Sequence, residues 1–209
     1  MTDMMLLVSM LVGIMADAAP ARMTAPSLRI TYAVAPTVSP SLLRNILSEA
    51  DALWRPAGVS FVWEPFDIKR PAAGLQVVVE DLHAASPEAE TRLGWLLFEH
   101  DMPTRILHVS YANACALLGN SGEVVGSVNR MPIAEREAYL GRAMGRALAH
   151  ELGHYLLASK AHAVSGLMRG TLSAETLFSP TRTRLDLPRT MRETLMARLA
   201  QSASGSANP

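Results

Sequence analysis

The sequence predicts an α+β domain in which a twisted, mixed sheet of four to five strands packs on two long helices, followed by a C-terminal helix. Short β-rich segments separated by turn residues fill most of the first half of the chain. Two longer segments repeat apolar residues at the three-four spacing of a buried helical face. The 209 residues, 49% hydrophobic and 18% charged, suffice for one globular core.

The first predicted helix runs from Leu42 to about Arg55. Ser41 is its expected N-terminal cap, and Pro56-Ala57-Gly58 ends it. The strands, each rich in β-branched or aromatic residues, are predicted at 28–35, 59–63, 76–80 and 105–111.

Three segments in the middle of the chain have weaker patterns. Residues 93–98 are apolar but contain Gly94, which indicates a loop or an edge segment. A short helix is expected at 114–118, and residues 123–128 are the candidate fifth strand.

The second long helix is predicted from Ile133 to Leu157 or Ala158, and Pro132 fits its first turn. Its glycines are small sites where another element can approach closely; they are Gly141, Gly145 and Gly153. A terminal amphipathic helix is predicted at about 188–200, and 202–209 are predicted to form a disordered tail.

The residues that carry chemistry lie on the second long helix. His150 and His154 are four positions apart, which advances a helix by ~6 Å and turns it ~40° past a full turn. Both imidazoles therefore project from one face, and Glu151 can reach a water on an ion held between them. Two histidines with an adjacent glutamate are the arrangement of zinc hydrolases. Such sites need a third protein ligand, and His162 is the nearest candidate.

This stretch resembles the metzincin metallopeptidases, and among them a small matrixin-like catalytic domain. The resemblance rests on His150-Glu151-Leu152-Gly153-His154, on His162 just beyond the helix, and on Gly166-Leu167-Met168 in the place of the Met-turn. Met168 lies eighteen residues after His150, the interval of the matrixin pattern. The resemblance implies a metzincin-like fold over most of residues 28–170, one catalytic Zn²⁺, and peptide or protein substrates.

The chain departs from the family pattern between the second and third histidines. The pattern places the third histidine six positions after the second, where this chain has Lys160, and His162 is eight positions after His154. The pattern also has a glycine where this chain has Leu157. Only glycine adopts a left-handed turn without steric cost. We expect residues 158–161 to make the turn and His162 to return to the metal.

The expected function is that of an exported zinc-dependent endopeptidase. Glu151 is the expected general base for the attacking water. An extended substrate is expected to pair with an exposed sheet edge, for which the candidate residues are His108, Val109, Ser110 and Tyr111.

Two other interpretations fit the same motif. A gluzincin-type zinc hydrolase would take a downstream carboxylate as third ligand, and Glu175 lies 21 residues after His154, within a possible short helix. A non-catalytic exported binding module would keep the metal site as a vestige. An intact Glu151 argues against that module, because a site that only binds metal does not need the carboxylate.

The N-terminus predicts export. Residues 4–15 form an apolar run too short to span a bilayer, followed by the small residues Ala16 and Ala18, which together predict a signal peptide over 1–18. Residues 19–27 are the expected linker, and 28–201 the catalytic domain. The segment before the run lacks Lys and Arg, which leaves a misplaced start site or an uncleaved anchor as alternatives. A cleaved chain would be periplasmic or extracellular, with no stable membrane association.

The composition bounds the partners. The chain has 19 basic and 19 acidic residues, so nothing in it points to nucleic acid or to a polybasic membrane surface. Cys115 is the single cysteine, which excludes an intrachain disulfide, and latency through a prodomain cysteine is not expected.

Overall fold

The computed structural model describes residues 27–69, 74–82 and 92–205. Its strands are β1 (Ser27–Val34), β2 (Ser60–Pro65), β3 (Leu75–Glu80), β4 (Gly94–Glu99) and β5 (Met102–Ser110). Its helices are α1 (Pro40–Trp54), α2 (Tyr111–Gly119), α3 (Gly122–Val125), α4 (Ile133–Leu157), α5 (Ala174–Phe178) and α6 (Arg189–Gly205), with 3₁₀ turns at Arg55–Ala57 and Val128–Arg130.

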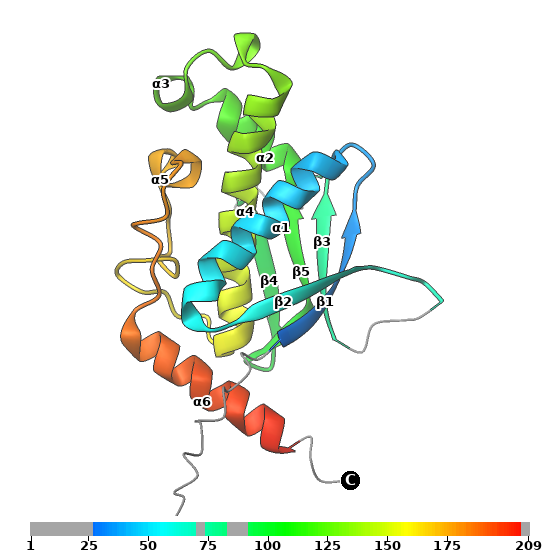
Figure 1. The fold of residues 1–209 in the computed structure, drawn as a ribbon, viewed down its shortest axis with the longest axis vertical. Coiled ribbons are helices and arrows are strands. Elements are labelled where there is room, and N and C mark those ends of the chain that lie inside the picture. Colours follow the sequence, from blue (N-terminus) through cyan, green and yellow to red (C-terminus); the bar gives the residue numbers. More distant parts are fainter. Residues whose placement is uncertain (1–26, 70–73, 83–91, 206–209) are drawn as a thin grey trace, which may run out of the picture.

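The five strands form one mixed sheet in the order β2-β1-β3-β5-β4. Strands β2, β1, β3 and β5 each run parallel to their neighbours in this order, and β4 pairs antiparallel with β5 at one edge. The α+β prediction, with four to five strands packed on two long helices, is confirmed. Helices α1 and α4 lie together across one face of the sheet, and α6 lies beyond the end of α4 (Figure 1).

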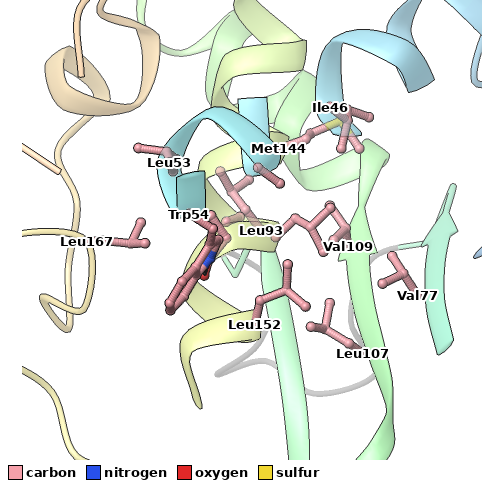
Figure 2. Packing of buried hydrophobic residues seen from close by; sticks show 14 of the residues in the cluster. Ile46, Leu53, Trp54, Val77, Leu93, Leu107, Val109, Met144, Leu152 and Leu167 are labelled. Atoms are coloured by element: carbon pink, nitrogen blue, oxygen red, sulfur yellow. Dashed lines mark hydrogen bonds between the residues drawn. The ribbon is translucent and has the colours of Figure 1, made fainter. Parts of the chain in front are cut away.

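The core lies between that face of the sheet and the two long helices. Alternate residues of β3 and β5 point into it, since Leu75, Val77 and Val79 are buried while the residues between them are half-buried. Figure 2 shows how side chains from α1, α4 and the strands meet there; they include Ile46, Trp54, Met144, Leu152, Leu107 and Val109. The Trp54 indole also donates a hydrogen bond of 3.0 Å to the carbonyl of Ala149 on α4.

Two glycines allow α4 to approach α1 closely, as their spacing predicted. A Cβ on Gly141 would lie 2.5 Å from Cβ of Asn45, and a Cβ on Gly145 would lie 2.5 Å from Cβ of Glu49. Real Cβ atoms do not come so near other heavy atoms. Helix α4 is therefore held against α1 directly before the turn that carries the histidine motif.

A buried ion pair joins the same two helices. Arg146 on α4 is fully buried, and its Nε donates to Glu49 Oε1 on α1 at 2.9 Å. Its Nη atoms donate to the carbonyl oxygens of Thr176, Ser179 and Thr181 in and after α5. Buried charges are tolerated when they are paired and fully hydrogen-bonded. Arg146 thus fixes both α1 and the segment after α5 to the helix of the candidate site.

The prediction of a strand at 123–128 was wrong. This segment forms the single turn α3 and then a bend at Gly126, whose φ of 82° is accessible mainly to glycine. The fifth strand is β4, for which a loop or an edge segment was expected. Gly94 does not break it; a Cβ there would lie 3.0 Å from Cγ of Glu151, so the strand needs glycine to reach α4.

The predicted cap of the first helix is shifted by two residues. Ser39 caps α1 by accepting a hydrogen bond from the N–H of Leu42, and Pro40 occupies the first helical position. Ser41 instead donates to the Glu137 carboxylate on α4 at 2.6 Å, as does Ser39 at 2.5 Å. The start of α1 is thereby tied to α4 as well.

The ends of the chain are only partly described. The signal peptide predicted at 1–18 and most of the linker predicted at 19–27 lie outside the described residues. Helix α6 extends to Gly205, into the segment predicted as a tail, and 206–209 lie outside the described residues. None of the helices that the structure describes is long and apolar enough to cross a membrane.

Candidate metal centre and active-site cleft

Helix α4 carries three of the predicted site residues within two turns. His150, Glu151 and His154 all lie in its C-terminal part, as the spacing predicted. His154 is 6% exposed and His150 is half-buried, whereas His162, from the loop after the helix, is exposed. The site therefore opens to solvent on the side of His162.

Backbone carbonyls orient the two helical imidazoles. Nδ1 of His150 donates to the carbonyl of Leu167 at 2.8 Å, and Nδ1 of His154 donates to the carbonyl of Ser159 at 2.6 Å. Because a carbonyl can only accept, Nδ1 carries the proton in each ring. Each Nε2 then keeps its lone pair, which is the state that ligates a metal.

The two Nε2 atoms face each other at 3.0 Å. Two lone pairs at this distance repel, and a cation between them removes the repulsion. Burial lowers the pKa of His150 to about 4 and also lowers the pKa of His154, which favours the neutral rings that a metal requires. The donor set therefore fits a metal ion rather than a structural histidine pair.

His162 completes the group. Ligand nitrogens of His150, His154 and His162 all lie within 4.8 Å of one another. The ring of His162 lies 5.4 Å from that of His150 and 4.9 Å from that of His154, centroid to centroid. Three nitrogen donors around one point, open on one side, suit zinc in a hydrolytic site.

The turn without a glycine is made by Ala158. Leu157 stays helical, and Ala158 takes the left-handed conformation with φ 44° and ψ 50°. The N–H of Ser159 then returns to the carbonyl of His154 at 3.2 Å. This turn also places the carbonyl of Ser159 on Nδ1 of His154. One strained alanine therefore ends the helix and orients the second histidine.

Lys160 leaves the metal position free for His162. Its ammonium pairs with Asp101 at 2.8 Å, beyond the end of β4, and lies 5.2 Å from the centre of the Phe98 ring. His162 packs instead on Gly170, where a Cβ would lie 3.3 Å from its Cγ and Nδ1. The backbone of Gly170 therefore supports the ring of the third histidine.

Met168 lies fully buried directly beneath the helical turn that joins the two ligands. A Cβ on Gly153 would overlap its sulfur, so the glycine makes room for this methionine. Gly166, at φ 81°, turns the chain before it against the carbonyl of Asp186. The N–H of Ala163 donates to the carbonyl of Met168 at 2.7 Å, which closes the loop that carries His162.

Glu151 has the environment of a general base. Burial raises its pKa to about 7, and the charge of Arg92 opposes this rise. Its carboxylate makes no hydrogen bond or ion pair with any side chain in the described part of the chain. A carboxyl whose pKa lies near neutrality can both take up and return a proton at that pH.

The three histidines and Glu151 line a cleft of about 720 Å³ that runs along β4. The cleft is lined by Arg92–Phe98, Ala147, His150, Glu151, His154, Lys160, His162, Arg169–Leu172 and Leu177. Its apolar lining includes Leu93, Ala147, Leu172 and Leu177. The edge strand, the carboxylate and the histidines thus share one open space.

The strand predicted to offer a free edge to substrate is not an edge strand. β5 is paired on both sides, with β3 and β4, so it has no free edge. His108 stacks on Trp95 and bonds Glu80 at 2.9 Å. Val109 is in the core, Ser110 caps α2, and Tyr111 begins that helix. The free edge beside the cleft is β4.

Glu175 does not join the metal ligands. It lies in the first turn of α5 and lines a separate cavity of about 390 Å³ with Thr176, Ser179 and Arg184. The short helix expected there exists, but Glu175 lines this cavity and not the cleft with the histidines. Among the described residues, the three histidines are the group whose ligand atoms converge.

Several site residues had no signal in the sequence. The carbonyls of Leu167 and Ser159 are backbone groups, and no residue type encodes them. Arg92 and Arg169 line the cleft only because distant segments meet there. Gly94 was interpreted as the sign of a loop or an edge segment; β4 is indeed an edge strand, and its glycine marks the close approach to Glu151.

Comparisons with known proteins agree with the fold. A scan of the sequence against protein-family models finds no match, and a search of curated proteins finds none either. Among solved structures, the chain is similar to archaemetzincin from Methanopyrus kandleri, with a TM-score of 0.53 and 14% identity over 87% of this chain and 99% of that chain. The fold is metzincin-like, and the histidine triad occupies it in the manner of a zinc site.

Proposed function

We propose that this protein is a zinc-dependent endopeptidase that is exported from the cell. The observation that carries the proposal is the convergence of three imidazole nitrogens beside an unpaired carboxylate in an open cleft. The metzincin-like fold supports peptide substrates. The eighteen-residue interval from His150 to Met168 supports a matrixin-like version of the site.

His150, His154 and His162 would hold the ion. A zinc ion held there would supply a water that is nucleophilic near neutral pH and would polarise a carbonyl. Glu151 takes the proton of the attacking water and passes it to the leaving amine. The carbonyls of Leu167 and Ser159 keep the first two rings in the ligating tautomer throughout.

Metal content and proteolysis together test this function. Purified wild-type protein should contain one zinc ion and cleave an unfolded protein. His162→Ala should lose the zinc, whereas Glu175→Ala should keep it, because Glu175 lines the other cavity. The opposite pair of results would make the site gluzincin-like.

Glu151→Gln distinguishes an enzyme from a binding module with a vestigial site. On the proposed mechanism this variant keeps its zinc and loses hydrolysis by several orders of magnitude. Two results together would favour the binding module. The zinc-loaded wild type would cleave no member of a peptide library, and the Glu151→Gln variant would behave in the same way.

Export is tested separately from catalysis. The apolar run at 4–15, followed by Ala16 and Ala18, supports a cleaved signal over residues 1–18. N-terminal sequencing of the mature protein after expression with its full leader should begin at Ala19. Retention of Met1 on a membrane-bound product would instead indicate an anchor.

A further inference from the structure

Among the described residues that line the cleft beside the candidate metal centre, three are cations and one is a carboxylate. The cations are Arg92, Lys160 and Arg169, and the carboxylate is Glu151. The chain as a whole has equal numbers of basic and acidic residues, so this excess is local. A divalent ion on three neutral imidazoles would add to it. The described lining of the cleft is therefore positive on a neutral protein.

Lys160 contributes least to this region. Its ion pair with Asp101 neutralises it at 2.8 Å, and the two side chains are 58% and 92% exposed. The pair lies at the far end of β4, next to Phe98. The charge excess that a ligand would meet comes from the two arginines.

Arg169 stands next to the third metal ligand. It follows Met168 directly, its side chain is exposed, and within the described ranges it makes no hydrogen bond or ion pair through its guanidinium. Its backbone is fixed, because its N–H donates to the carbonyl of Gly166 at 3.3 Å. Gly170, the next residue, contacts the ring of His162. A ligand at the metal would therefore pass within reach of this guanidinium.

Arg92 stands just before β4, at the start of the strand that runs along the cleft. It directly precedes Leu93 and β4, and its carbonyl accepts a hydrogen bond of 2.7 Å from the Asn113 side chain, which holds the backbone there. It lines the cleft together with Glu151 and Arg169. In the described part of the chain its guanidinium has no ion-pair partner.

We infer that the cleft selects acidic peptide segments, with Asp or Glu side chains near the scissile bond. This inference rests on the proposed peptidase function and adds a substrate class to it. Arginine forks bind carboxylates with two parallel hydrogen bonds, so Arg92 and Arg169 suit these side chains. A basic segment would meet like charges in the same cleft, which adds discrimination.

The test compares two matched peptides. One has Asp or Glu at two positions on each side of an apolar central pair, and the other has Asn or Gln there. Wild type should cleave the acidic peptide with a kcat/KM about five- to ten-fold higher at low salt. The preference should shrink at high ionic strength, because solvent-facing charges are screened.

Variants locate the preference. Arg169→Gln should reduce it to about two-fold, and Arg169→Glu should turn it toward a Lys-containing peptide. Arg44→Gln removes an exposed arginine from α1, outside the cleft, and should leave the preference unchanged. Equal cleavage of both peptides by wild type, or a full preference in Arg169→Gln, would overturn the inference and leave the peptidase function standing.

Binding separates the inference from the function. Fluorescence anisotropy with labelled peptides on the Glu151→Gln variant needs no hydrolysis. If wild type cleaves neither peptide, the peptidase proposal fails. Tighter binding of the acidic peptide that is lost on adding Arg169→Gln would still support a cleft for acidic segments, and equal binding of both peptides would overturn it.

Discussion

Replacing Glu151 by Gln should stabilise the metal-free protein while it abolishes hydrolysis. Burial raises the pKa of this carboxyl from 4.5 to about 7, and no described side chain bonds it. Above pH 7 the folded protein must therefore keep an ionised carboxylate where the neutral form is favoured. Glutamine has nearly the same shape and no charge.

The size of the effect follows from the raised pKa. The difference between 4.5 in the unfolded chain and about 7 in the folded one corresponds to about 3 kcal/mol. Between these values the folded state binds more protons than the unfolded state, so stability falls as the pH rises through this window. The advantage of the Gln variant should be near zero at pH 4.5 and reach about 3 kcal/mol at pH 8.

Urea unfolding of both metal-free proteins at pH 5 and pH 8 measures this difference. Glu99→Gln removes an exposed carboxylate from β4 and controls for the loss of one negative charge. Saturating zinc should shrink the difference, because a cation beside Glu151 favours its ionised form. Two results would refute this reasoning: a stability gain of the Gln variant below about 1 kcal/mol at pH 8, or a gain at pH 5 equal to the gain at pH 8. Either would show that the fold does not disfavour the ionised form of Glu151.

Three further changes test the packing around the site. Arg146→Met should lower the free energy of unfolding by about 3 kcal/mol, because it leaves the buried carboxylate of Glu49 with Arg182 as its remaining partner and leaves three carbonyls without their donor; a loss under 1 kcal/mol in urea would contradict this. Ala158→Gly should raise it by about 0.5 kcal/mol, because glycine takes the left-handed turn without strain; a lower melting temperature would argue against strain there. Gly153→Ala should lower it by about 1–3 kcal/mol by displacing Met168, and should weaken zinc binding in a chelator competition; unchanged stability and affinity would show that Met168 can move aside.

Local patterns predicted the two long helices and the three histidines that meet after the second one. The three-four spacing of apolar residues placed α4 to within a residue of its ends, and the four-residue interval brought His150 and His154 together. His162 was predicted from its position after the helix, and the structure brings it to the same point. These features depend on neighbours in the sequence, so the sequence reports them directly.

Features that depend on distant segments were missed. Gly94 interrupts an apolar run, and only the nearness of Glu151 explains why a strand accepts it. Whether a strand lies at an edge depends on the whole sheet. The residues at 105–111 therefore gave no sign that β4 pairs with them and takes the edge position. The Arg146–Glu49 pair joins residues 97 positions apart, and periodicity contains no information about such a partner.

The left-handed turn at Ala158 has a consequence for how such sites are found. A search pattern with a glycine three positions after the second histidine, and the third histidine six positions after it, would pass over this chain. Here the left-handed residue comes one position later and the histidine two positions later, yet the same three nitrogens meet. An alanine can take that conformation at a cost of about 1 kcal/mol, so the glycine is helpful rather than indispensable. Searches that require His-Glu-x-x-His, allow a turn of variable length, and then look for a histidine and a buried methionine would recover sequences that fixed intervals exclude.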